Sequence, residues 1–395
     1  MELTDFDCNQ FVAILQEELV PALGCTEPIA IAYAGAHARA LLGKIPDRVY
    51  IKSSGNIIKN VKSVTVPNSG NMKGIPAAAA IGIIGGNPDK GLEVLADITE
   101  SDIASTKEFL EKIPCKVSLL DTVASLHFIV EVFAGADSAS VEIIHQHTNI
   151  VHTTKNGKDV LSVPFDPASA NAALTDRSGL SVKKILEFAD TIDLNRVRPI
   201  LERQIDYNTR IAQEGLEHRY GINAGANLLK AAEAEQAVTL KIRAQAAAAA
   251  GSDARMSGCT LPVVTNSGSG NQGLTASLPV IVFAEEKKLP HDKLLRGLLV
   301  SNLIAIHQKT RIGRLSAYCG AVSAGCGSGA AVTYLSGGSY EQVCETITNT
   351  LAVVSGIVCD GAKPSCASKI ASSVDAALNA HYLAMQNRVF EPGEG

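Results

Sequence analysis

Val358-Cys-Asp-Gly-Ala-Lys-Pro-Ser-Cys-Ala367 places Cys359 and Cys366 among small and polar residues, between two predicted helices at 340–357 and 364–386. A third cysteine in similar surroundings, Cys319, lies in Tyr318-Cys-Gly320. Three converging thiolates can hold three irons of a cubane [4Fe–4S] cluster and leave one iron open as a Lewis acid. The alternative is structural thiols, because free cysteine often behaves as a small buried hydrophobe.

The chain around these cysteines is predicted to be almost entirely helical from about Ser181 onward. Glycine-rich loops at 266–273, 326–329 and 359–364 separate the helices. The candidate helices span 181–192, 194–215, 224–250, 291–308, 328–336, 340–357 and 364–386.

Before residue 166, the sequence predicts both helices and strands. Residues 8–42 predict two helices interrupted by the loop Leu23-Gly-Cys-Thr-Glu-Pro28. Residues 48–67 alternate strand-like segments with turns, and a helix is expected at 101–112. Further strands are expected at 92–98, 115–120, 126–133, 138–147 and 149–155.

These patterns predict an α+β protein with a helical catalytic core and an inserted α+β domain that carries an antiparallel sheet. The core combines N-terminal helices at 1–44, which pack on it, with a mainly helical iron–sulfur domain at 166–395. The inserted domain spans 45–165.

Composition narrows the classes of partner. The 395 residues carry a net charge of −5 without a basic stripe, which argues against nucleic acid. No apolar run reaches the length of a membrane span. Nine cysteines and an acidic N-terminus without a signal pattern predict a reducing, cytoplasmic location.

Cys25, in Gly24-Cys-Thr-Glu-Pro28, is a candidate base or nucleophile. It precedes a predicted helix, whose dipole is expected to lower the pKa of the thiol. The alternative is a buried cysteine in a turn. Cys326 is a rival to Cys319 as a cluster ligand because two helical turns separate them, and the role of Cys259 stays open.

Three loops rich in Gly, Ser and Asn resemble anion-binding nests, in which backbone N–H groups hold a carboxylate. Plain turns are the alternative for each loop. His145, His147 and His152 are interpreted as surface or interface residues, and Lys363 is not favoured as a pyridoxal-phosphate lysine. The candidate substrate-binding residues are Ser53, Ser54, Gly55 and Asn56; Asn68, Ser69 and Asn71; and Asn266, Ser267, Gly268, Ser269 and Asn271.

Gly24-Cys-Thr-Glu-Pro28, Asn266-Ser-Gly-Ser-Gly-Asn-Gln-Gly273 and the segment from Cys359 to Cys366 resemble signatures of the L-cysteine desulfidase family. The C-terminal half is more distantly similar to the catalytic domain of iron–sulfur L-serine dehydratases. The resemblance implies a [4Fe–4S] cluster on Cys319, Cys359 and Cys366, with an open iron for the substrate carboxylate, and Cys25 as the base. The loop between Cys359 and Cys366 looks shorter than in the dehydratases.

The implied reaction is α,β-elimination on a small L-amino acid, with L-cysteine converted to pyruvate, ammonia and sulfide. An L-serine or L-threonine dehydratase of the same mechanism is the first alternative. A pyridoxal-phosphate lyase and a non-catalytic iron–sulfur or redox-sensing protein stay open. The expected partner is a small amino acid, and assembly into a homo-oligomer is compatible with the sequence.

Overall fold

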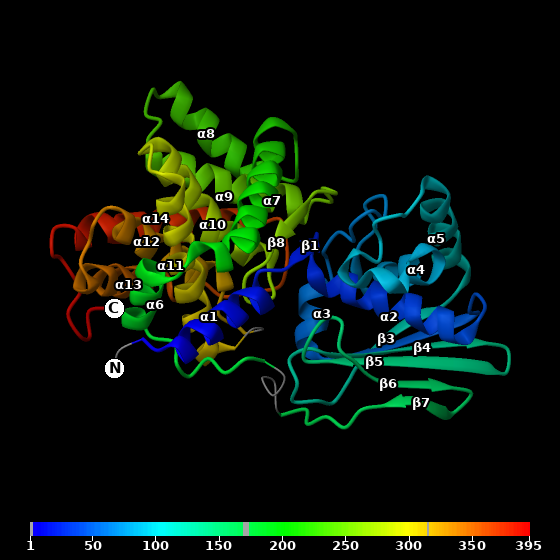
Figure 1. Ribbon diagram of the computed structural model, residues 1–395. Coiled ribbons are helices and arrows are strands. Elements are labelled where there is room, and N and C mark those ends of the chain that lie inside the picture. Colours follow the sequence, from blue (N-terminus) through cyan, green and yellow to red (C-terminus); the bar gives the residue numbers. More distant parts are fainter. Residues whose placement is uncertain (1–2, 169–173, 314–315) are drawn as a thin grey trace.

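The computed structural model describes residues 3–168, 174–313 and 316–395. Two lobes with separate apolar cores make up the molecule (Figure 1). One lobe is a bundle of helices, and the other is a sheet with helices packed on it. The predicted α+β class is therefore confirmed.

The larger sheet has six strands in the order β3-β2-β4-β5-β6-β7. The pair β2–β3 is parallel, whereas the other neighbours are antiparallel, so the sheet is mixed and not wholly antiparallel as predicted. The parallel pair is feasible because three helices lie between these strands in the chain and provide a long crossover. The strands are β2 (Arg48–Ser53), β3 (Cys115–Leu119), β4 (His127–Ala134), β5 (Asp137–Ile144), β6 (Ile150–Lys155) and β7 (Lys158–Ser162).

One face of this sheet packs against α2 (Thr26–Leu42) and α4 (Gly74–Gly85). Alternate strand residues such as Val49, Ile51 and Val130 point into this core. Helix α5 (Glu100–Lys112) packs on α4. The two N-terminal helices therefore pack on different lobes: α1 (Asp5–Glu18) packs on the helical lobe, whereas α2 packs on the sheet.

Two expected strands are helical or irregular. Residues 55–61 form α3 (Gly55–Val61), whose buried residues are Ile57, Asn60 and Val61. Burial at i, i+3 and i+4 fits one face of a helix, whereas i and i+3 lie on opposite faces of a strand. The segment expected as a strand at 92–98 begins within the 3-10 helix η1 (Pro88–Glu93) and continues in turns.

The helical lobe is larger than the sequence pattern suggested. The expected helix 224–250 is two helices, since Gln236 has a φ of 53° and Thr239 caps the second one. A helix from Gly270 was missed because Gly273 and Pro279 lie inside it. The helices are α6 (Val182–Thr191), α7 (Arg198–Glu217), α8 (Ala224–Ala234), α9 (Leu240–Met256), α10 (Gly270–Glu286), α11 (His291–Ile312), α12 (Gly320–Leu335), α13 (Tyr340–Val354) and α14 (Cys366–Ala384), with the 3-10 turn η2 (Leu194–Arg196).

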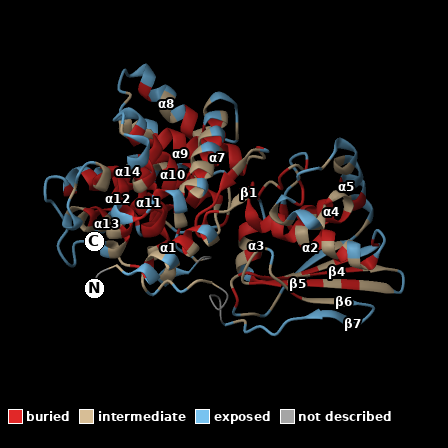
Figure 2. Cartoon of the chain, in the orientation of Figure 1, coloured by how far each residue is buried: buried red, intermediate tan, exposed pale blue. Residues whose placement is uncertain are grey.

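Small residues let these helices approach closely. The run Ala246–Ala250 is buried at the centre of the lobe, where α9 contacts α7, α8, α10 and α14 (Figure 2). A Cβ added to Gly215 of α7 would lie 2.0 Å from the Ala250 carbonyl oxygen. In the described part of the chain, no helix combines the length and apolar character needed to cross a bilayer.

Helix α2 approaches α4 equally closely, since a Cβ added to Gly82 would lie 2.0 Å from the Ala32 carbonyl oxygen. Gly82→Ala should therefore lower the free energy of unfolding by about 1–3 kcal/mol. Chemical denaturation followed by circular dichroism measures the effect. Gly356→Ala is the matched control, because a Cβ there meets nothing within 4 Å. Equal stability of the two variants would contradict the tight α2–α4 contact.

Candidate active site

A short two-stranded sheet brings the N-terminal segment onto the helical lobe. Strand β1 (Pro21–Leu23) pairs antiparallel with β8 (Pro262–Val264). Beyond the ladder, Thr265 donates its backbone N–H to the Val20 carbonyl oxygen at 2.9 Å. Strand β1 leads through Cys25 into α2, and β8 leads through a loop into α10. Because the two strands are paired, Cys25 lies next to the loop before α10. The Thr26 hydroxyl donates to the Gly268 carbonyl oxygen at 3.2 Å.

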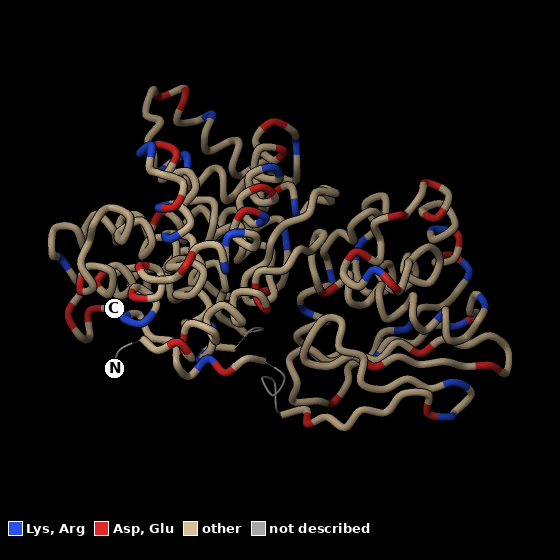
Figure 3. Tube along the Cα trace, viewed as in Figure 1, with Lys and Arg blue, Asp and Glu red and all other residues tan. Residues whose placement is uncertain are grey.

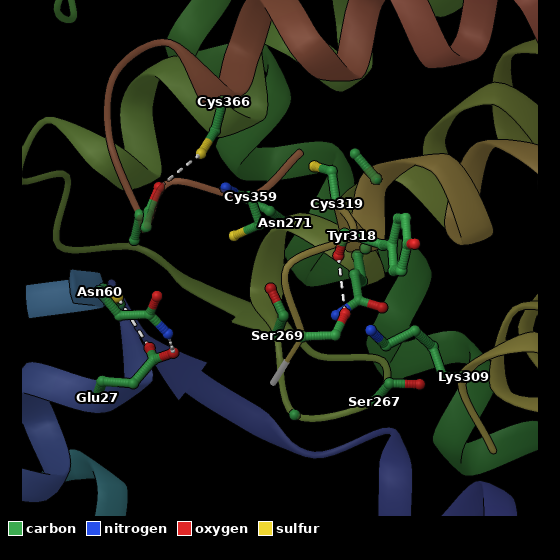
Figure 4. A pocket seen from close by; sticks show the side chains of 18 of the residues that line it. Glu27, Asn60, Ser267, Ser269, Asn271, Lys309, Tyr318, Cys319, Cys359 and Cys366 are labelled. Atoms are coloured by element: carbon green, nitrogen blue, oxygen red, sulfur yellow. Dashed lines mark hydrogen bonds between the residues drawn. The ribbon is translucent and has the colours of Figure 1, made fainter. Parts of the chain in front are cut away.

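A cavity of about 110 Å³ lies where the two lobes meet. It has room for several water molecules, and so for a small ligand. Figure 4 shows Glu27 and Asn60 reaching in from the sheet lobe and the three candidate ligand cysteines on the helical lobe. The polar and charged residues that line it include Cys25, Glu27, Lys59, Asn60, His145, His147, Arg255, Ser267, Ser269, Asn271, Gln272, Lys309, Cys319, Cys359 and Cys366.

Cys319, Cys359 and Cys366 all line this cavity from different segments. Cys319 precedes α12, and its N–H donates to the Ile357 carbonyl oxygen at 3.0 Å. Cys359 is held beside it because its own N–H donates to Ala317 at 2.6 Å. Cys366 is the first residue of α14, and its sulfur lies 3.8 Å from the Gly361 carbonyl oxygen. The structure therefore brings the three thiols to one wall of the cavity.

Burial raises the pKa of Cys319 to about 11, and the charges of Cys359 and Cys366 act in the same direction. Burial likewise raises the pKa of Cys366. The Lys369 ammonium opposes both effects, and its Nζ is fixed by the Asp360 carboxylate at 2.6 Å. The thiols are thus close enough to influence one another. Even so, the described residues contain no group of three His, Cys, Asp or Glu side chains placed to bind one metal ion.

Cys25 and Glu27 form a buried pair on the opposite lobe. The Cys25 thiol donates to Glu27 Oε2 at 3.0 Å, and the Asn60 amide donates to Oε1 at 3.0 Å. Burial and then the Glu27 charge raise the pKa of Cys25 well above its usual value. Burial also disfavours the Glu27 carboxylate, but His147, the Cys25 thiol and Arg255 outweigh it and lower its pKa. The proton therefore rests on sulfur, and the expected lowering of the Cys25 pKa by the helix dipole is wrong.

Four helices begin at the cavity without a side-chain cap. Helices α2, α10, α12 and α14 all place first-turn or N-cap residues in its lining, and none has a side-chain hydrogen bond at its N-cap. Side chains do cap α1, α5, α6, α9 and α13. Free N–H groups and the positive ends of the dipoles favour anions, so this arrangement suits thiolates and carboxylates.

Only the third of the three glycine-rich loops reaches the cavity. Its Ser267, Gly268, Ser269 and Asn271 line it, while Asn266 is buried behind and donates to Asn302 Oδ1 at 3.0 Å. Ser267 and Gly268 have φ of 51° and 76°, so the chain turns sharply here.

The first two loops use their side chains locally. Ser53 is the buried end of β2, and the Ser54 hydroxyl donates to the Ser125 carbonyl oxygen at 2.8 Å. Gly55 and Asn56 open α3, whose later residues, not these, line the cavity. Asn68, Ser69 and Asn71 line a separate pocket of about 640 Å³, where the Asn68 amide donates to the Leu95 carbonyl oxygen at 2.8 Å.

Several lining residues were missed or misread from the sequence. His145 and His147, which the sequence suggests as surface or interface residues, both line the cavity at the junction of the lobes. No pattern singled out Asn60 or Arg255, since each arrives from a helix whose other residues look structural. Cys326 does not line the cavity: it is buried inside α12, where its sulfur lies 3.8 Å from the Ile347 carbonyl oxygen. Cys259 lies outside the lining as well, beside Leu261.

The sequence of this chain is similar to those of known proteins. Residues 89–394 match the sequence model of the serine dehydratase alpha chain. A UPF0597 protein of Treponema denticola is 57% identical over 396 residues, covering 100% of this chain and 92% of that protein. A UPF0597 protein of Lachnoclostridium phytofermentans is 54% identical over 387 residues (98% and 91%), and one of Desulfitobacterium hafniense is 50% identical over 395 (100% and 91%).

The match includes all three candidate ligand cysteines, whereas Cys25 precedes it. The relationship to serine dehydratases that the cysteine segments suggested is confirmed. The chain belongs to the serine dehydratase alpha chain family.

Proposed function

We propose that this protein catalyses α,β-elimination on a small L-amino acid, with L-cysteine as the substrate and pyruvate, ammonia and sulfide as products. The observation that carries the proposal is one cavity with three thiols on one lobe and the Cys25–Glu27 pair on the other. Metal-binding groups and a proton acceptor on either side of a small ligand are what this chemistry needs.

Cys319, Cys359 and Cys366 would hold the cofactor, a [4Fe–4S] cluster with one open iron. Three soft sulfur donors that share a wall without meeting at a single ion's position suit a polynuclear cluster better than a mononuclear metal. The uncapped starts of α12 and α14 favour the negative charge of such a group. When bound, it supplies a Lewis acid beside the substrate.

Cys25 is assigned the removal of the Cα proton. Its thiol first passes its own proton to Glu27 Oε2, the acceptor 3.0 Å away, and the freed sulfur then takes the proton from Cα. The electron pair of the broken Cα–H bond forms the Cα=Cβ double bond, and the β-substituent leaves with the electron pair of its bond to Cβ. The resulting aminoacrylate becomes an imine and hydrolyses in water to pyruvate and ammonia.

The transfer from Cys25 to Glu27 is uphill, because the thiol pKa is raised and the carboxyl pKa is lowered. The reactive thiolate is therefore a minor species at neutral pH. Turnover should rise with pH as the thiol is titrated.

Dehydration of L-serine or L-threonine by the same residues is the second candidate. The family match favours it, since the matching model describes serine dehydratases. Protein reconstituted with iron and sulfide under anaerobic conditions should release pyruvate from one of L-cysteine and L-serine, or 2-oxobutyrate from L-threonine. No keto acid from any of the three would reject both candidates and favour a non-catalytic iron–sulfur protein.

Replacing any of Cys319, Cys359 and Cys366 by serine should remove most of the bound iron and the visible absorption of the cluster. Each variant loses one of the thiolates that hold the cluster. Iron and acid-labile sulfide are quantified after anaerobic reconstitution. Cys344→Ser is the matched control, because Cys344 lies on α13 outside the cavity. Full iron content in any of the three variants would remove that residue from the ligand set.

Cys25→Ser should keep its iron but lower kcat by about 100-fold or more, because a serine hydroxyl ionises far less readily than a thiol and so rarely provides the anionic base. Steady-state keto-acid release and iron content are measured on the same preparation. A variant with wild-type turnover would exclude Cys25 from the mechanism.

Glu27→Gln should move the rising limb of the pH–rate profile to lower pH. After burial, the Glu27 charge is the largest cause that raises the pKa of Cys25, so its removal makes the thiol more acidic. Maximal turnover should fall as well, because the proton acceptor is lost. The exposed Glu286→Gln is the control. An unmoved limb, or one at higher pH, would contradict the pairing of Glu27 with Cys25.

A further inference from the structure

Buried charges are few in the described chain, and most have an evident partner. Figure 3 shows Lys, Arg, Asp and Glu concentrated toward the outer surfaces of both lobes. Asp7 is buried but pairs with Lys184 at 2.8 Å, and Glu18 pairs with Arg177 at 2.6 Å. Arg255 is different. It is only 4% exposed, and it forms no ion pair with any carboxylate in the residues that the structure describes.

The hydrogen bonding of Arg255 is equally poor. Its Nη1 donates to the Met256 sulfur at 3.5 Å, a weak acceptor, and its Nε has no partner in the described chain. A buried, unpaired guanidinium is costly, because burial removes water without replacing its hydrogen bonds. Such a group calls for a nearby anion, and Glu27, the carboxylate that it acts on electrostatically, forms no ion pair with it in the described chain.

The surroundings of Arg255 hold its side chain at the cavity. It is the last residue but one of α9, and it lines the cavity. Its guanidinium lies against Gly270, where an added Cβ would be 2.3 Å from Nε. Gly270 is the first residue of α10, one of the helices that begin at the cavity uncapped. The positive charge of Arg255 and the free N–H groups of this helix therefore act on the same space.

The positive charge of Arg255 influences residues on both lobes of the cavity. Arg255 acts electrostatically on Cys25 and Glu27 from one lobe and on Cys366 from the other. A ligand bound beside Arg255 would thus lie near the base and near the candidate ligand cysteines at once.

We propose that Arg255 binds the α-carboxylate of the amino-acid substrate. The identity of the ligand rests on the proposed function, while the anion site rests on the unpaired guanidinium. A planar guanidinium matches a carboxylate with two parallel hydrogen bonds, which also fixes the orientation of Cα. Neutralising the carboxylate makes the Cα proton easier to remove, because less negative charge accumulates.

Among the cavity's other cations, Lys59 is already engaged. Its Nζ donates to the Cys359 carbonyl oxygen at 3.3 Å and so helps to join α3 to the cysteine loop. The competing interpretation is that Arg255 only balances the charge of Glu27. In that case its removal would alter the pH dependence of turnover without altering which ligands bind.

Calorimetric titration with L-alanine and L-alaninamide separates these interpretations. L-alanine has no β-leaving group, so it binds without being eliminated. L-alaninamide has a similar size and shape but carries a neutral carboxamide in place of the carboxylate. Reconstituted wild-type protein should bind L-alanine about 10-fold or more tightly than the amide. Arg255→Gln should bind both ligands with similar, weak affinity, and Arg255→Lys should recover part of the preference for L-alanine.

Arg243→Gln is the matched control, because Arg243 lies on the same helix with its side chain 55% exposed. It should keep the wild-type preference. An Arg255→Gln protein that still prefers L-alanine as wild type does would overturn the proposal. So would wild-type protein that binds both ligands equally, a result that does not require the variant to fold.

The same titration distinguishes this proposal from the proposed reaction. If wild-type protein releases no keto acid but its preference for L-alanine depends on Arg255, the carboxylate site stands and the reaction assignment fails. If keto acid is released with no role for Arg255 in binding, the reaction stands and the carboxylate site fails.

Discussion

The pairing of β1 with β8 is the constraint on which the site depends. Helix α1 belongs to the helical lobe and α2 to the sheet lobe, so the chain must cross between them within the few residues around β1. The three residue pairs between β1 and β8 fix that crossing at the point where β8 enters the loop before α10. Cys25 and Ser267 therefore share one cavity although more than half the chain separates them. Neither lobe holds a complete site alone.

Helix packing supplies the electrostatics of the cavity. Alanine and glycine on facing helices let the backbones approach more closely than larger side chains would allow. Several helices can therefore begin within a small volume. The helices that start there forgo side-chain caps, each worth about 1 kcal/mol. What they gain is a set of N–H groups turned toward a common space. Side chains do cap other helices, as at Thr4 and Thr99, so the sequence can provide such caps where no shared cavity lies at the helix start.

Local sequence predicted much of this structure. The helical C-terminal half, the candidate cysteines and most strands follow from periodicity and from the flanking residues. Other features depend on contacts between distant parts of the chain and could not be predicted from local sequence. Residues 55–61 look strand-like in the sequence, but the joint burial of Ile57, Asn60 and Val61 fits one face of a helix. The pKa of Cys25 depends on burial and on Glu27 more than on its helix. Arg255 looks like an ordinary helix residue, and its isolation is visible only once the lobes meet.

The raised pKa values of the buried cysteines have a consequence for how the proposed cluster would be loaded. Thiolates, not thiols, react with oxidants, so burial that favours the protonated forms of Cys319 and Cys366 protects the metal-free sulfurs from oxidation. Binding of iron by these sulfurs would release their protons into solution. Loading of the proposed cluster would then be a proton-releasing step, favoured in alkaline surroundings and opposed by acid, and the same burial that protects the metal-free chain would set the acidity at which it can be loaded.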